Sequence, residues 1–143
     1  MNRVLVCCAA ALMLAACSTT APRPDQVRTP PAERVMLFQD PSAGDATIVV
    51  TRDVGFTGSG CYGAVFVDGQ VAAKLGRGER VKFYVPAGDH ILGTWNTGEG
   101  LCGYHEGKER KEVSVALRKG EERKFRIAIN PNAGVDLMPT TLD

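Results

Sequence analysis

The fold is decided by residues 112–130, which read EVSVALRKGEERKFRIAIN. Apolar residues alternate with polar or small ones before Gly120, and the alternation resumes after it. A period of two places all the apolar side chains on one face of an extended strand. Residues 118–121, RKGE, supply the turn between the two runs. We therefore predict two β-strands that are joined as a hairpin and that each bury one face.

The same kind of pattern recurs along residues 33–143. Short extended runs are expected at residues 35–38, 46–51, 64–67, 70–75, 81–85, 91–95 and 135–138. Asp68-Gly69 is a strong hairpin signal, and residues 86–89, PAGD, form a turn cluster. No segment after the first sixteen residues has a helical period. The sequence predicts an all-β domain, a single antiparallel β-sandwich or small barrel of about seven to eight short strands.

The first sixteen residues differ from the rest of the chain. Arg3 gives a positive start, and residues 4–14 form an uncharged apolar run that includes Cys7 and Cys8. The run is shorter than the roughly 20 residues that a membrane-spanning helix needs. Its length and flanks are typical of a secretory signal peptide, which is removed from the mature protein.

Residues 14–17 read LAAC. This segment resembles the lipobox of bacterial lipoproteins, in which cleavage occurs just before a lipidated cysteine. The resemblance implies a signal peptide at residues 1–16 and a mature chain that begins with an acylated Cys17. Two or more acyl chains give durable membrane binding. Ser18, where similar proteins retained at the inner membrane carry Asp, implies the periplasmic face of the outer membrane of a Gram-negative bacterium. An ordinary cleaved signal, with Cys17 merely near the cut, is the alternative.

The segment that follows is rich in proline and poor in large apolar residues. Its prolines are Pro22, Pro24, Pro30 and Pro31. Such a composition favours an extended chain, which over fifteen residues reaches about 45 Å. We therefore expect the lipidated cysteine and a Pro-rich tether at residues 17–32, followed by the β-sandwich domain at residues 33–143.

Charge excludes one class of partner. The chain holds 17 Lys and Arg against 16 Asp and Glu, and removal of residues 1–16 takes away one arginine. The mature chain is then neutral. Nucleic-acid binding depends on a surplus of basic residues along the phosphate backbone. We therefore expect no nucleic-acid partner.

The mature domain carries Cys61 and Cys102, with forty residues between them. An even pair in an exported protein favours a disulfide. By the chain-entropy model, closing such a loop contributes about 4 kcal/mol to the free energy of unfolding. Three alternatives remain open: a redox-active pair, a zinc site that also recruits His90 and His105, and two free thiols.

A second resemblance covers residues 61–95, and it rests on the order of the turns and short strands. The string consists of FVDGQV (66–71), GRGE (76–79), VKFYV (81–85), PAGDH (86–90) and IL (91–92). It resembles small periplasmic β-sandwich domains of bacterial lipoproteins, and it is similar to PEGA-type surface domains, in which a Pro-x-Gly turn joins two strands. The resemblance implies a binding or structural module, and no catalytic residue comes with it.

Residues 97–110 form a loop with four glycines. Loops on rigid β scaffolds commonly carry recognition. We predict an interaction surface there, made of Trp95, Glu99, Tyr104 and His105. The sequence shows no G-x-S-x-G, H-E-x-x-H or phosphate-binding motif, so we expect no enzyme, no cofactor and no metal.

These features predict a non-catalytic module of the cell envelope that is held at the membrane by its anchor and engages a protein partner. One alternative is a small-ligand or cell-wall glycan binder, with Trp95, Tyr62 and Tyr104 as aromatic platforms. Another is an enzyme, in particular a thiol oxidoreductase that uses Cys61 and Cys102.

Overall fold

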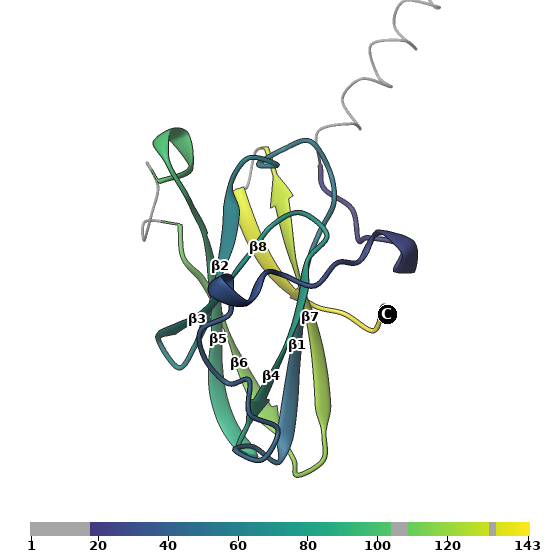
Figure 1. Cartoon of the computed structure of the whole chain (residues 1–143), viewed down its shortest axis with the longest axis vertical. Helices are drawn as coiled ribbons and strands as arrows, with labels where there is room; N and C mark the ends of the chain where they lie inside the picture. Colours follow the sequence, from purple (N-terminus) through teal and green to yellow (C-terminus); the bar gives the residue numbers. More distant parts are fainter. Residues whose placement is uncertain (1–17, 104–108, 132–133) are drawn as a thin grey trace, which may run out of the picture.

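The computed structural model describes residues 18–103, 109–131 and 134–143. In these residues, two four-stranded sheets pack face to face as a sandwich, with no closed barrel and no α-helix (Figure 1). The strands are β1 (Ala46–Arg52), β2 (Tyr62–Val67), β3 (Gln70–Leu75), β4 (Arg80–Val85), β5 (Gly88–Thr97), β6 (Lys111–Leu117), β7 (Glu122–Asn130) and β8 (Gly134–Pro139). Short 3₁₀ turns are η2 (Pro24–Gln26), η3 (Ala32–Arg34) and η4 (Gly100–Cys102). The predicted β-sandwich is confirmed.

The strand order is β4-β1-β7-β8 in the first sheet and β3-β2-β5-β6 in the second. β1 and β7 run parallel, with Thr47 opposite Glu122. The other neighbours are antiparallel. The sandwich is therefore mixed, and not antiparallel throughout as the sequence suggested.

The predicted hairpin at Gly120 is wrong. β6 pairs with β5 in the second sheet, whereas β7 pairs with β1 and β8 in the first. The turn carries the chain from one sheet to the other, and the N–H of Gly120 is fixed by the carbonyl of Asp45 at 2.6 Å. Alternation shows which face of a strand is buried, but two strands that face each other across a sandwich have the same pattern as a hairpin pair.

The hairpin at Asp68-Gly69 is confirmed, because β2 and β3 pair directly through it. Both turn residues have positive φ, 50° and 81°. That is the geometry of a type I′ turn, which matches the twist of the flanking strands.

The core fills the space between the sheets with the inward faces of both. Its largest fully buried apolar side chains are Phe83, Ile48, Leu75, Leu92 and Ile127. Phe66 is also buried, but it lies outside this core, on the outer face of the second sheet. Each side chain of this size gains roughly 1.5–3 kcal/mol when it leaves water. The alternating positions predicted in β4 and β7 supply the inward side chains of those strands.

Residues 18–39, here called the strap, run along the sandwich and cover two of its edge strands (Figure 1). The N–H of Met36 donates to Ala72 of β3 at 2.8 Å, and the N–H of Tyr84 in β4 donates to Phe38 at 2.9 Å. The predicted run at residues 35–38 is therefore an edge cover and not a full strand. Covering an edge blocks its pairing with another chain.

The expectation of a free tether is corrected by the same contacts. Residues 18–32 lie against the sandwich, and Pro22 and Pro30 are buried. The strap is also fixed by the Arg34 guanidinium, which bonds both carboxylate oxygens of Glu79 at 2.6 and 2.7 Å. The sequence did not reveal this docking because each contact involves one or two residues and leaves no periodic pattern.

Candidate functional site

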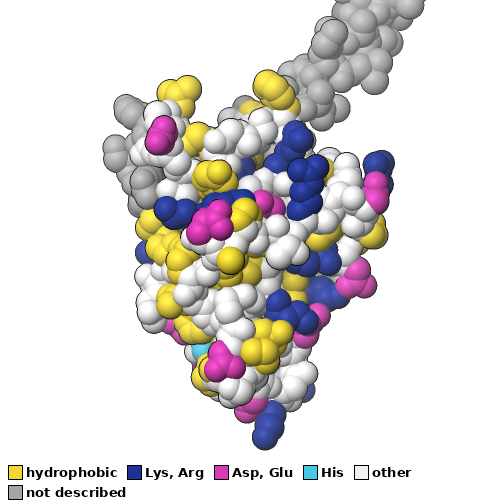
Figure 2. Space-filling model, viewed as in Figure 1, with side chains coloured by type: hydrophobic (Ala, Val, Ile, Leu, Met, Phe, Trp, Pro, Cys, Tyr) yellow, Lys and Arg dark blue, Asp and Glu magenta, His cyan; other side chains and the backbone are white. Residues whose placement is uncertain are grey.

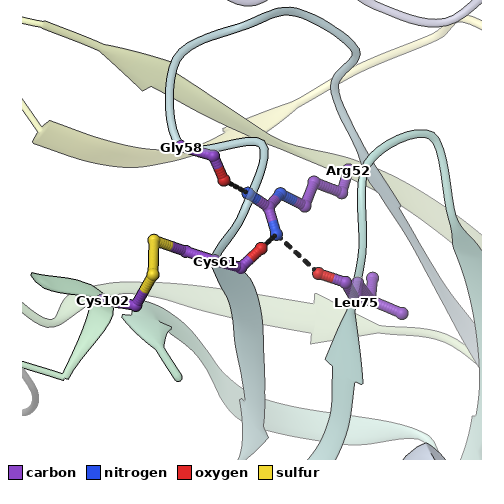
Figure 3. Close-up of a disulfide and its surroundings, with 5 residues drawn as sticks. All are labelled: Arg52, Gly58, Cys61, Leu75 and Cys102. Carbon is purple, nitrogen blue, oxygen red and sulfur yellow. Dashed lines mark hydrogen bonds between the residues drawn. A yellow bond between two sulfur atoms is a disulfide. The ribbon is translucent and has the colours of Figure 1, made fainter. Parts of the chain in front are cut away.

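The Cys61–Cys102 disulfide joins two loops at one end of the sandwich, here called the disulfide end (Figure 3). Cys61 closes the β1–β2 loop, and Cys102 lies in η4 of the β5–β6 loop. Their Cα atoms are 5.3 Å apart. The predicted disulfide is confirmed. Free thiols and a zinc site built on these cysteines are both excluded, because the two sulfurs are bonded to each other.

Arg52, the last residue of β1, is 2% exposed and stabilises the β1–β2 loop from inside. Its guanidinium donates to the carbonyls of Gly58 at 2.6 Å and Leu75 at 2.8 Å, and also to the carbonyl of Cys61 (Figure 3). Burial lowers the pKa of Arg52 to about 10, against the opposing field of Glu79. Arg52 is therefore still charged at neutral pH, and the three backbone carbonyls that accept its hydrogen bonds stabilise this charge.

The start of the strap docks at this same end. The N–H of Thr20 donates to Val54 at 2.8 Å, and the N–H of Val54 donates back at 2.9 Å. Thr19 lies between Asp53 and Ile129: its hydroxyl donates to the Asp53 carboxylate at 3.3 Å and accepts from the Ile129 N–H at 2.7 Å. The start of the strap is thus tied to the first sheet, next to the end of β1 and near the end of β7.

Asp53 is the second buried charge here, at 2% exposure. Burial raises the pKa of its carboxyl, while Arg126, at 3.5 Å, and Thr19 oppose that rise. One carboxylate oxygen, Oδ1, has no hydrogen-bond partner in the described part of the chain. The docking of Thr19 therefore supplies one of the few polar contacts that this carboxylate has.

Trp95 lies on the outer face of the second sheet and is partly buried. Its ring packs on Phe66, with the ring centroids 3.9 Å apart. The Arg110 guanidinium lies over both rings, 4.5 Å from the Phe66 centroid and 5.3 Å from the Trp95 centroid. Trp95 is thus the centre of a stacked cluster and not an open aromatic platform.

Tyr62 lies on the same outer face and is 40% exposed. The Arg34 guanidinium of the strap covers part of its ring, 4.7 Å from the centroid. The outer face beside the disulfide therefore combines two aromatic rings with two arginines, Arg34 and Arg110. We call Tyr62, Trp95, Arg34 and Arg110 the arginine–aromatic face.

The predicted interaction surface is only partly described. Glu99 is exposed at the start of η4, where its carbonyl accepts from the Cys102 N–H at 3.2 Å. Tyr104 and His105 lie outside the described residues, as does Cys17. The arginines that build the site were missed, because a single charged residue at the end of an apolar run, such as Arg52, carries no signal of burial.

His90 lies at the opposite end of the sandwich, near the β2–β3 turn. Its Nδ1 is 2.7 Å from the Asp68 carboxylate, and its Nε2 is 2.8 Å from the Pro86 carbonyl. Partial burial disfavours the charged ring, but these two acceptors outweigh it and raise the pKa of His90. These contacts link the β2–β3 turn to the turn at residues 86–89, which gives His90 a structural role.

In comparisons with known proteins, no family model, no curated protein and no solved structure matches this chain. The resemblances found in the sequence therefore stay predictions. Within the described residues, no helix is long and apolar enough to cross a membrane, and no group of three or more His, Cys, Asp or Glu side chains is placed to hold a metal ion.

Proposed function

We propose that this protein is a lipid-anchored, non-catalytic module of the Gram-negative cell envelope, held at the periplasmic face of the outer membrane and bound to a protein partner. The observation that carries the anchor is the sequence of residues 4–17, where an uncharged apolar run leads into LAAC. Cys17 would be the acylated residue, and its acyl chains would hold the domain at the bilayer.

Two features of the described residues support this proposal. Disulfides persist in oxidising compartments such as the bacterial periplasm, and Cys61 and Cys102 form one. Ser18 is exposed where the strap begins, so a modified residue 17 leaves the contacts of Thr19 and Thr20 intact.

The arginine–aromatic face is the surface we propose for the protein partner. Tyrosine, tryptophan and arginine are the residue types that most often dominate binding energy at interfaces. Here the rings and guanidinium groups are stacked on one another before any partner binds. Such side chains lose little conformational freedom on association, which favours affinity.

The test is photocrosslinking in cells that express the full chain at its native level. A photoreactive phenylalanine analogue at position 62 should yield a defined protein adduct, identified by mass spectrometry. The matched control places the analogue at Arg123, a 53% exposed side chain on β7 of the other sheet, where no adduct is expected.

Equal labelling from both positions, or no adduct from position 62, would contradict a partner at this face. In that case a change in Trp95 fluorescence on adding cell-wall fragments would favour the glycan-binding alternative. The Cys17→Ala variant should move from the membrane fraction to the soluble fraction. Its retention in the membrane would contradict the anchor.

A further inference from the structure

The two most exposed large apolar side chains of the described residues lie in the two loops of the disulfide end. Phe56 in the β1–β2 loop is 87% exposed, and Leu101 in the β5–β6 loop is 91% exposed. The Cys61–Cys102 bond joins these loops directly. Figure 2 shows hydrophobic side chains projecting from this upper end of the molecule, with lysine or arginine side chains below them.

Both loops are held in place from within. The Arg52 guanidinium fixes the carbonyls of Gly58 and Cys61, and the Ser59 N–H donates to the Phe56 carbonyl at 3.1 Å. Leu101 is adjacent to the disulfide itself. The hydrogen bonds and the disulfide thus hold the backbone of both loops so that the two apolar side chains project outward.

The strap begins next to Phe56. Gly55, its neighbour in sequence, approaches Thr19 so closely that an added Cβ would lie 3.0 Å from the Thr19 Cα. Cys17 is two residues before Thr19, and two residues span at most about 7 Å. Acyl chains on Cys17 would therefore enter the bilayer immediately beside this end. Because the strap is docked from Thr19 onward, the domain cannot move far from the bilayer surface.

We propose that the disulfide end lies against the lipid bilayer, with Phe56 and Leu101 inserted at the interface between headgroups and acyl chains. This inference rests on the proposed acylation of Cys17. Apolar side chains at such an interface leave water for acyl chains, and this adds to the anchor. The arginine–aromatic face then points along the membrane plane, where a neighbouring envelope protein can reach it.

Basic side chains beside Gly55 support the proposal that this end of the molecule binds a lipid bilayer. Arg28 and Arg77 line a hollow of about 280 Å³ beside Gly55. The Arg77 guanidinium is held at 3.5 Å from the Gly55 carbonyl. Guanidinium groups bind phosphate oxygens in a fork geometry. Two arginines close to the loop of the exposed Phe56 match the layering of a bilayer surface, in which phosphate groups lie above acyl chains.

The test uses the full-length protein purified from membranes and reconstituted into phosphatidylethanolamine–phosphatidylglycerol vesicles that contain brominated lipids. Trp95→Phe removes the native tryptophan and keeps a ring on Phe66. In that background, Phe56→Trp and Leu101→Trp each report lipid contact by fluorescence quenching. Lys119→Trp, in the exposed β6–β7 turn at the opposite end, is the matched control.

We expect bromolipids to quench residues 56 and 101 at least about threefold more than residue 119, because interfacial apolar groups lie roughly 5–10 Å deep. The two positions are independent, so poor folding of one variant leaves the other to decide. Equal quenching at all three positions would overturn the orientation. An N-terminal peptide without an acyl mass would instead overturn the anchor, which the same preparation reports by mass spectrometry.

Discussion

The hydroxyl of Thr19 accepts a hydrogen bond from the backbone N–H of Ile129 at 2.7 Å, across 110 residues of sequence. Through it the first described residues are tied to the far end of β7. The same hydroxyl donates to Asp53, whose buried carboxylate has an oxygen with no hydrogen-bond partner in the described residues. The Thr19 hydroxyl therefore helps to hold the start of the strap against the sandwich, two residues from Cys17.

Replacement of Thr19 by valine keeps its shape and removes both hydrogen bonds. Because buried groups lose their partners, we expect the free energy of unfolding to fall by about 1–2 kcal/mol. Urea denaturation measures this change. The control is Thr29→Val, since Thr29 is exposed on the strap, and it should cost less than about 0.5 kcal/mol. Equal losses in the two variants would contradict the proposed role of Thr19.

Arg52 should be among the most sensitive positions of the chain. Arg52→Met leaves three carbonyls without their donor, and we expect a loss of about 3 kcal/mol or more in the free energy of unfolding. Arg123→Met removes a 53% exposed guanidinium paired with Glu121 and should cost below about 0.5 kcal/mol. Thermal denaturation of both variants provides the comparison. A loss for Arg52→Met as small as that of the control would show that the β1–β2 loop does not depend on this guanidinium.

The disulfide should stabilise the domain chiefly by restricting the unfolded chain. The Cys61→Ser, Cys102→Ser double variant should lose about 4 kcal/mol, the value expected for a loop of this length. A reductant should lower the stability of the unmodified protein and leave the variant unchanged. If the reductant destabilises the variant as much as the unmodified protein, the reductant does not act through the Cys61–Cys102 bond.

The contacts of His90 predict a pH dependence of stability. Burial alone would lower the pKa of His90, but Asp68 and the Pro86 carbonyl raise it above its ordinary value of 6.5. A group with a raised folded-state pKa stabilises the fold fully below its unfolded pKa, and this stability is lost as pH rises through the folded pKa. Asp68 keeps its charge across this range, because its pKa is lowered from 3.8 despite partial burial.

We therefore expect the urea denaturation midpoint to decrease as the pH rises above 6.5, the ordinary pKa of histidine, because the folded-state pKa of His90 is raised. His90→Gln should flatten this dependence. A variant whose midpoint falls as steeply as that of the unmodified protein would assign the effect to another group.

Local features of the fold could be predicted from the sequence. The β-branched cluster at residues 48–50 predicted β1, and Asp68-Gly69 predicted a turn that both residues form with positive φ. The disulfide followed from an even pair of cysteines in a chain with a signal-like N-terminus. Each of these inferences depends on neighbouring residues or on one simple count.

Features that depend on contacts between distant parts of the sequence could not be predicted. Nothing in residues 118–121 distinguishes a hairpin from a crossover between sheets, because both bury the same alternating positions. The strap was expected to be free, since prolines and polar residues form no core of their own. Its docking depends on edges of β3 and β4 that exist only after the sandwich has formed. The burial of Arg52 likewise depends on carbonyls from β3 and the β1–β2 loop.

The measurement that tests the central claim most directly is intact mass analysis of the N-terminal peptide from protein isolated with the membrane fraction. We predict that the chain begins at Cys17 and carries the mass of a diacylglycerol group and an amide-linked acyl chain. A chain that retains residues 1–16, or one that begins near residue 17 without acyl mass, would contradict the account.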